Sequence, residues 1–343
     1  MYAPRNVNDR SDNQQQIRIT GPAEFVAAIP ALLGFHPEKS VVAVLMQGTR
    51  LICSVRSDLY DDPRPVAEVI GNAATNGGAN RVLLAIYTDG DAETVLAYAD
   101  PLAAILTTAG LLLGDLLLVQ SGRFWSLMCH DPGCCPPEGT CIPVGTTQLE
   151  SEQVGRGRLA VAASRQELAE RYTPRPELIA DPSVYREAAG ALAQPLAVRC
   201  QQAMTDLRLL VAATHRPDRR LVDQGPVEVA RIRLTMFLDD VTVRDYLLAG
   251  LASGEGSPAA AEALTQLALT APPEVRASVA ATAAMVQAMN AGSPVGVWSL
   301  LELAPDNTLG LLLAKSIDAG FTPDMLRQVL IAAMPEIEAR LMN

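Results

Sequence analysis

The pattern of secondary-structure signals changes once along this chain, near residue 147. Before that point, short β-branched and apolar runs alternate with helical stretches, and after it only helical patterns follow. Such alternation is typical of a mixed α/β unit with a partly parallel sheet. We therefore expect an α/β domain at residues 17–147, followed by an all-α helical domain at residues 148–343 with a sub-boundary near residue 222. Residues 1–16 are polar, bury little surface and are predicted to form a disordered tail.

The first part carries clear strand and helix signals. The run Lys39–Met46 is apolar almost throughout, which predicts a central strand buried on both faces. Pro22 suits the first position of a helix, and Gly34 is a natural left-handed terminator. The predicted strands are Ile17–Thr20, Lys39–Met46, Leu51–Ser57, Arg81–Tyr87, Leu113–Val119 and Arg123–Met128. The predicted helices are Pro22–Leu33, Arg64–Thr75 and Ala92–Ala109.

Proline and glycine punctuate the second part. Several helical stretches carry proline near the first turn and glycine just after the last, as helix termini favour. Ser164 and Glu167 have the spacing of a capping box, and Pro195 should interrupt a long helix. The predicted helices are Gln148–Gly155, Arg165–Arg171, Pro182–Ala213, Pro226–Leu238, Val243–Ala252, Pro258–Leu269, Pro273–Asn290, Gly296–Leu303, Thr308–Ala319 and Pro323–Met334. Short loops between them predict antiparallel helix packing.

Charge and the polar N-terminus argue against a nucleic-acid-binding protein and against a secreted or membrane-anchored protein. The formal net charge is −11, which repels phosphate backbones and disfavours nucleic acid as a partner. The best basic patch, Arg216–Arg220, is short, contains an aspartate and has no neighbouring aromatic residue, so we interpret it as a solvated loop. The polar N-terminus resembles neither a signal peptide nor a membrane anchor, and we expect a cytoplasmic protein.

The strongest chemical signal is a cysteine-rich stretch at the end of the α/β part. Cys129, Cys134, Cys135 and Cys141 lie within 13 residues and account for four of the six cysteines. Four thiolates at this spacing could hold one structural zinc ion in a loop that lacks apolar filling. The spacing departs from the two separated pairs of common zinc sites, and a variant with His130 replacing one cysteine is an alternative.

Other interpretations of the same stretch stay open. A disulfide at Cys134–Cys135, or from Cys129 to Cys134 or Cys141, would be labile or regulatory in a reducing cytosol. A reactive thiol needs a nearby base or cation, and only His130 and Arg123 are local. The fourth interpretation is that these are small residues filling a tight turn, a common fate of free cysteine.

Weaker polar signals lie elsewhere. Arg56 and Asp58 are two apart on a strand, so both face the same side and could bind a polar ligand at the strand end; a surface ion pair is the preferred interpretation. Arg123 and His130 complete the candidate polar residues. The chain contains no Walker, dinucleotide-binding, nucleophile-elbow or paired zinc-protease motif.

Several landmarks occur together in one order. They are Leu32–Val42 (LLGFHPEKSVV), Arg56–Leu59, Gly122–Gly139 with its Cys134-Cys135-Pro136, Ser164–Leu168, Val243–Asp245 and the helical tail from Ala283 to Pro323. Together they resemble an actinobacterial family known as domain of unknown function 4192. The chain departs from the family's Gly-Asp-Gly in having Ala291-Gly292-Ser293. The resemblance covers most of the chain from about Ile17 and supports the division into two parts, but it implies no catalytic residue, cofactor or substrate.

No complete catalytic constellation accompanies the long helical part. We therefore expect a non-catalytic binding or regulatory protein that contacts protein partners through its helical half. The competing hypothesis is a thiol- or zinc-dependent enzyme that acts on a small polar substrate at the Cys129–Cys141 loop.

Overall fold

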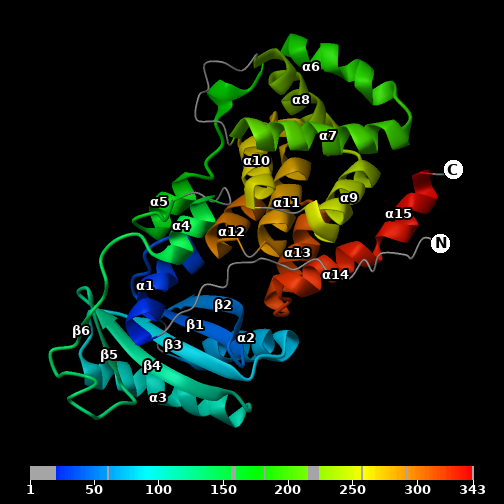
Figure 1. Cartoon of the computed structure of the whole chain (residues 1–343). Coiled ribbons are helices and arrows are strands. Elements are labelled where there is room, and N and C mark those ends of the chain that lie inside the picture. Colours follow the sequence, from blue (N-terminus) through cyan, green and yellow to red (C-terminus); the bar gives the residue numbers. More distant parts are fainter. Residues whose placement is uncertain are drawn as a thin grey trace, which may run out of the picture.

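Figure 1 shows the computed structural model of the chain, which describes residues 21–59, 62–155, 160–180, 182–214, 224–255, 258–290 and 292–341. The predicted tail at residues 1–16, the predicted strand Ile17–Thr20 and the basic patch Arg216–Arg220 lie outside the described residues, as does the sub-boundary near residue 222.

The N-terminal part is built on a mixed six-stranded sheet with the order β2-β1-β3-β4-β5-β6. Its strands are β1 (Ser40–Gln47), β2 (Arg50–Asp58), β3 (Arg81–Tyr87), β4 (Leu112–Gln120), β5 (Arg123–Ser126) and β6 (Thr140–Cys141). β3 and β4 run parallel, and the other neighbouring pairs are antiparallel. The predicted strands from residue 39 onward are confirmed to within a few residues, whereas β6 was not predicted.

Helices cover both faces of this sheet. Alternate residues of β1 point to opposite faces, as the two-residue period of a strand requires. Val41, Ala43 and Leu45 pack in one apolar cluster with α2 (Arg64–Gly77) and α3 (Ala92–Thr108). Val42 and Val44 belong to a second cluster with α1 (Pro22–Leu33). β1 is therefore buried on both faces, as its composition predicts.

The rest of the described chain is helical apart from its loops and one isolated bridge (Figure 1). The α-helices are α4 (Gln148–Gly155), α5 (Arg165–Glu170), α6 (Pro182–Ala188), α7 (Leu196–Thr214), α8 (Gln224–Phe237), α9 (Val241–Gly250), α10 (Pro258–Leu269), α11 (Pro273–Met289), α12 (Pro294–Glu302), α13 (Thr308–Asp318), α14 (Pro323–Ala332) and α15 (Met334–Leu341). Short helical turns occupy Pro176–Leu178, Ala189–Ala193 and Leu251–Glu255. The chain is interrupted before α7 at Pro195, as predicted, while α15 begins where a single helix was expected to end.

The buried helix α11 lies at the centre of the helical part. It contacts α10, α12, α13 and α14. Ser164 caps the N-terminus of α5, and its Oγ accepts a hydrogen bond from the Glu167 N–H at 3.0 Å. The Glu167 carboxylate accepts from the Ala163 N–H at 2.8 Å, one residue before the position that a capping box requires.

The two parts share apolar core. The sheet face that carries α1 forms one cluster with residues from α5 and from α7 through α13. The backbone adds a parallel bridge between Phe35 and Ala162, which fixes the end of α1 against the segment before α5. A second contact joins α2 to the turn before α14, where Asn76 Nδ2 donates to the Ala319 carbonyl at 2.6 Å.

Within the described residues, every helix falls short of the length and apolar character that crossing a bilayer would demand.

Candidate functional site in the cysteine-rich loop

The cysteine-rich loop, residues 127–139, joins β5 to β6 at one edge of the sheet (Figure 1). Side chains of β5 hold its far end. The Arg123 guanidinium donates through Nη1 to the Glu138 and Gly139 carbonyls at 3.2 and 2.8 Å. The Trp125 indole donates to the Pro137 carbonyl at 3.0 Å. Because β5 is paired with β4, these hydrogen bonds fix the loop to the sheet.

A hydroxyl holds the near end of the loop. Ser126 Oγ donates to Asp115 Oδ1 at 2.7 Å and accepts from the backbone N–H groups of Met128 and Cys129 at 3.3 and 3.2 Å. A tight turn follows, in which the Asp131 carbonyl accepts from the N–H groups of both Cys134 and Cys135. The turn brings Cys134 and Cys135 back to Cys129.

Three cysteines form a cluster at this turn. The Sγ atoms of Cys129, Cys134 and Cys135 all lie within 4.8 Å of one another. All six cysteines of the chain are free thiols. Cys141 lies on β6, is exposed and is not part of the cluster. The structure therefore brings together three of the four cysteines that the spacing suggested.

Hydrogen bonds make the three thiols unequal. The pKa of Cys129 is lowered, first because the backbone N–H of Asp131 donates to its sulfur and then because the thiols of Cys135 and Cys134 do so. The pKa of Cys135 is raised to about 12, mainly because its thiol donates to Cys129 and also because it is partly buried. The arrangement thus favours one thiolate, at Cys129, held by two neighbouring thiols.

The cluster opens onto a pocket of about 410 Å³. Cys129, Cys134 and Cys135 form one wall, and Asp115 and Ser126 contribute polar groups. Glu24, in the first turn of α1, also lines the pocket. An ion held by the three sulfurs would therefore have one side facing this pocket.

The other candidate polar residues do not gather at one place. Arg56 and Asp58 form an ion pair at 2.6 Å, as the preferred interpretation expected, and Asp58 also faces Arg165 at 3.5 Å. Both lie on β2, at the opposite edge of the sheet from β5 and β6. Arg123 is engaged in anchoring the loop, and His130 is exposed beside Cys129.

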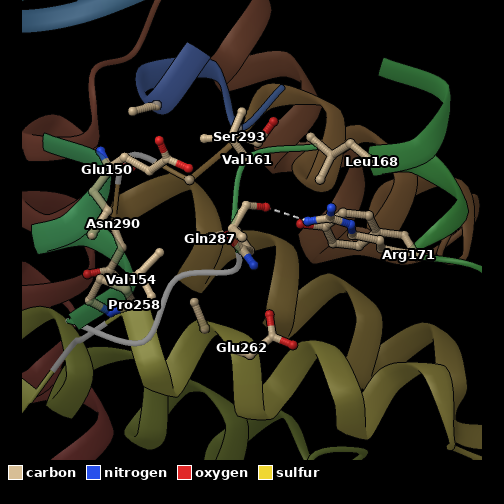
Figure 2. A pocket seen from close by; sticks show the side chains of 17 residues that line it. Glu150, Val154, Val161, Leu168, Arg171, Pro258, Glu262, Gln287, Asn290 and Ser293 are labelled. Carbon is tan, nitrogen blue, oxygen red and sulfur yellow. Dashed lines mark hydrogen bonds between the residues drawn. The ribbon is translucent and has the colours of Figure 1, made fainter. Parts of the chain in front are cut away.

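Sequence reasoning missed a small polar cavity between the two parts of the chain (Figure 2). It holds about 60 Å³, enough for a few water molecules rather than an organic ligand. Glu262 lines it, and burial raises the pKa of this carboxyl although Gln266, Arg175 and Arg171 oppose the shift. The Ser293 hydroxyl is buried there without a hydrogen-bond partner. The only sequence signals were two distant landmarks, Gly34 and Gly292-Ser293, that meet at this cavity.

The described chain thus defines a class of protein in which a mixed α/β sheet carrying a three-cysteine cluster packs against a large helical part. It belongs to the family described as "Domain of unknown function (DUF4192)", whose sequence model matches residues 22–324. Searches of curated proteins and of solved structures gave no match.

Proposed function

We propose that this protein is a non-catalytic binding protein of the cytoplasm, in which Cys129, Cys134 and Cys135 bind a thiophilic metal ion, with zinc as the first candidate. The observation that carries the proposal is the convergence of three free thiols within 4.8 Å on a loop that hydrogen bonds fix to the sheet. The three thiols would stay reduced in a reducing compartment, which is consistent with the proposed cytoplasmic location.

The spacing of the sulfurs suits a tetrahedral ion. With zinc–sulfur bonds of about 2.3 Å, the sulfurs of a tetrahedral site lie about 3.8 Å apart. Thiols that lie within 4.8 Å of one another need only small side-chain rotations to reach that distance. Metal binding would release thiol protons, and the lowered pKa of Cys129 would make its thiolate the most readily available of the three ligands. His130 or a water molecule would supply the fourth ligand.

The pocket beside the cluster supports a second candidate function. A catalytic zinc site keeps one coordination position open, whereas a structural site is closed by four protein ligands. Because the three cysteines line the pocket of about 410 Å³, a fourth position filled by water would face a space that admits a small polar substrate. This arrangement favours the alternative of a metal-dependent enzyme over a reactive free thiol.

Metal content measured on protein purified from cells tests the proposal. We expect about one zinc per chain in the native protein and in Cys141→Ser, because Cys141 is a thiol outside the cluster. Cys129→Ser and Cys135→Ser should bind zinc at least tenfold more weakly, which corresponds to about 1.4 kcal/mol. Equal metal binding by all four proteins, or no metal in any of them, would sink the proposal.

Cobalt substitution separates the two functions. The visible spectrum of Co²⁺ responds to its ligands, so added azide changes the spectrum only where a coordination position is exchangeable. An unchanged spectrum supports a closed structural site, with His130 as the fourth ligand. A changed spectrum supports the enzyme.

Protein partners for the helical half stay a prediction. Leu311, Leu312 and Val329 are exposed apolar side chains on the neighbouring helices α13 and α14, which is compatible with a protein contact there.

A further inference from the structure

A third and larger pocket lies at the carboxyl ends of the two parallel strands. β3 ends at Tyr87 and β4 at Gln120, and residues from both ends line the pocket together with residues of α1. Its volume of about 970 Å³ is within the range of small-molecule sites. Open α/β sheets bind their ligands outside the carboxyl ends of parallel strands, so the position favours a ligand site.

One residue that lines this pocket, Tyr87, carries a hydroxyl group without a partner. This hydroxyl is buried and makes no hydrogen bond. Ser40 lies directly opposite Tyr87 in the antiparallel pairing of β1 and β3, so the two side chains share one face of the sheet. Ser40 is fully buried, and its hydroxyl is likewise unpartnered. Ser40 does not line the pocket, so only the Tyr87 hydroxyl would meet a ligand there. An unsatisfied buried polar group costs about 1–3 kcal/mol, and the Tyr87 hydroxyl therefore requires an explanation.

Backbone strain is concentrated at the same pocket. Among the described residues, Lys39 and Ser121 are the only non-glycine residues with positive φ, at 43° and 49°. Both line the pocket. Ser121 and Gly122 connect β4 to β5, and two-residue hairpin turns ordinarily adopt positive φ. Lys39 has no such turn, and a left-handed conformation costs it of the order of 1 kcal/mol or more, a strain of the kind that gathers at ligand sites. The pocket, the unpartnered Tyr87 hydroxyl and the strained backbone of Lys39 are separate observations that coincide at one end of the sheet.

The lining indicates the class of ligand. Val26, Ala27 and Pro30 of α1 offer an apolar wall. Three carboxylates, Glu38, Asp89 and Glu150, line the pocket against one ammonium group, that of Lys39. The excess of negative charge favours a cation and opposes phosphates and carboxylates.

We propose that this pocket binds a small organic amine. Its apolar body would contact α1, its ammonium group would face the carboxylates, and a polar group would give the Tyr87 hydroxyl its partner. The site shares no lining residue with the pocket beside the cysteine cluster, so the proposal stands or falls independently of metal binding.

The test uses a matched pair of probes, phenethylamine and phenylacetate, with two-dimensional NMR of the full chain. The two molecules have similar apolar bodies and opposite charges. We expect phenethylamine to shift the backbone signals of Thr88, Asp89 and Ser121, and phenylacetate to leave them unchanged. Shifts caused by phenylacetate alone would overturn the ligand class, and no shift from either probe would overturn the site.

Tyr87→Phe tests the role of the unpartnered hydroxyl. The variant keeps the ring and removes the orphaned group, so its melting temperature should equal or exceed that of the native protein. Its affinity for phenethylamine should fall at least fivefold if the amine or a water held by it bonds to the hydroxyl. Tyr98→Phe is the matched control, since Tyr98 packs on the opposite face of the sheet and should bind the amine normally. A destabilised Tyr87→Phe protein with undiminished binding would show that the hydroxyl has a structural partner and would refute its role.

Discussion

Gly139 determines how closely the cysteine-rich loop approaches the sheet. Its φ of +78° lies in the left-handed region, and a Cβ atom at this position would lie 2.4 Å from Cε2 of Trp125. The same indole donates the hydrogen bond that fixes the loop at Pro137. One glycine therefore serves both the backbone turn and the close approach of Trp125.

Gly139→Ala should lower the free energy of unfolding by about 2–3 kcal/mol, because left-handed strain and overpacking add. Urea denaturation measures the loss. Gly122→Ala is the control: Gly122 has a similar φ of +74°, but a Cβ there would meet no atom within 4 Å. The difference between the two variants isolates the contact with Trp125. Equal losses would show that this contact contributes nothing.

The spacing of the cysteines in the sequence predicts only part of the candidate site. The short spacing of Cys129, Cys134 and Cys135 suffices to predict their convergence, because one tight turn brings them together. Cys141 is also close in sequence, yet it lies in β6, where its pairing with Arg123 of β5 keeps it in a strand, and that pairing depends on tertiary structure. The pocket at the ends of β3 and β4 could not be predicted from the sequence, because its position depends on which strands are neighbours in the sheet.

At the scale of helices and strands, proline and glycine made most helix ends predictable. Two elements that were not predicted, β6 and α15, were missed for physical reasons. β6 has only two residues and is a strand because it pairs with β5, so no local sequence pattern predicts it. α14 ends before Pro335, which lacks a backbone N–H and crowds the carbonyl four residues earlier. That proline was an available signal for the separate helix α15.

Helix α10 carries a carboxyl group that makes stability depend on pH. Burial raises the pKa of Glu262 above its ordinary value of 4.5. The folded protein therefore holds this proton more tightly than the unfolded chain does. The free energy of unfolding contributed by this group consequently falls as pH rises from the unfolded to the folded pKa.

Glu262→Gln removes this dependence, so the variant should be more stable than the native protein at pH 7, and the two should converge below about pH 4. Thermal denaturation across this pH range measures the effect. Glu302→Gln is the control, because it makes the same charge change at an exposed position on α12. A Glu262→Gln protein that is less stable at pH 7 would mean that the carboxylate is stabilised by Arg171 and Arg175 more than burial destabilises it.

At the scale of the whole molecule, the change of pattern near residue 147 predicted the secondary structure of the two parts. It did not predict how the two parts pack against each other. The last strand ends at Cys141 and α4 begins at Gln148, close to the predicted boundary. The apolar cluster nevertheless continues from the sheet into the helices. Strand order and this shared core depend on contacts between residues far apart in sequence, which a local pattern does not encode.

The shared core predicts that the two parts unfold together, and Gly320 offers a way to test it. Gly320 lies between α13 and α14 with a φ of +76°, and a Cβ there would lie 2.9 Å from backbone atoms of Asn72 and Ala73 in α2. Gly320→Ala should therefore cost at least about 2 kcal/mol by forcing the turn away from α2, while calorimetry still records one transition.

Gly110→Ala is the matched control, because Gly110 also follows a helix and has a φ of +89°. A Cβ atom at this position would meet no atom within 4 Å. The variant should lose only the cost of left-handed strain, about 1 kcal/mol. Two separate transitions in the native protein would refute a shared core. A Gly320→Ala protein no less stable than Gly110→Ala would show that the contact with α2 does not couple the two parts.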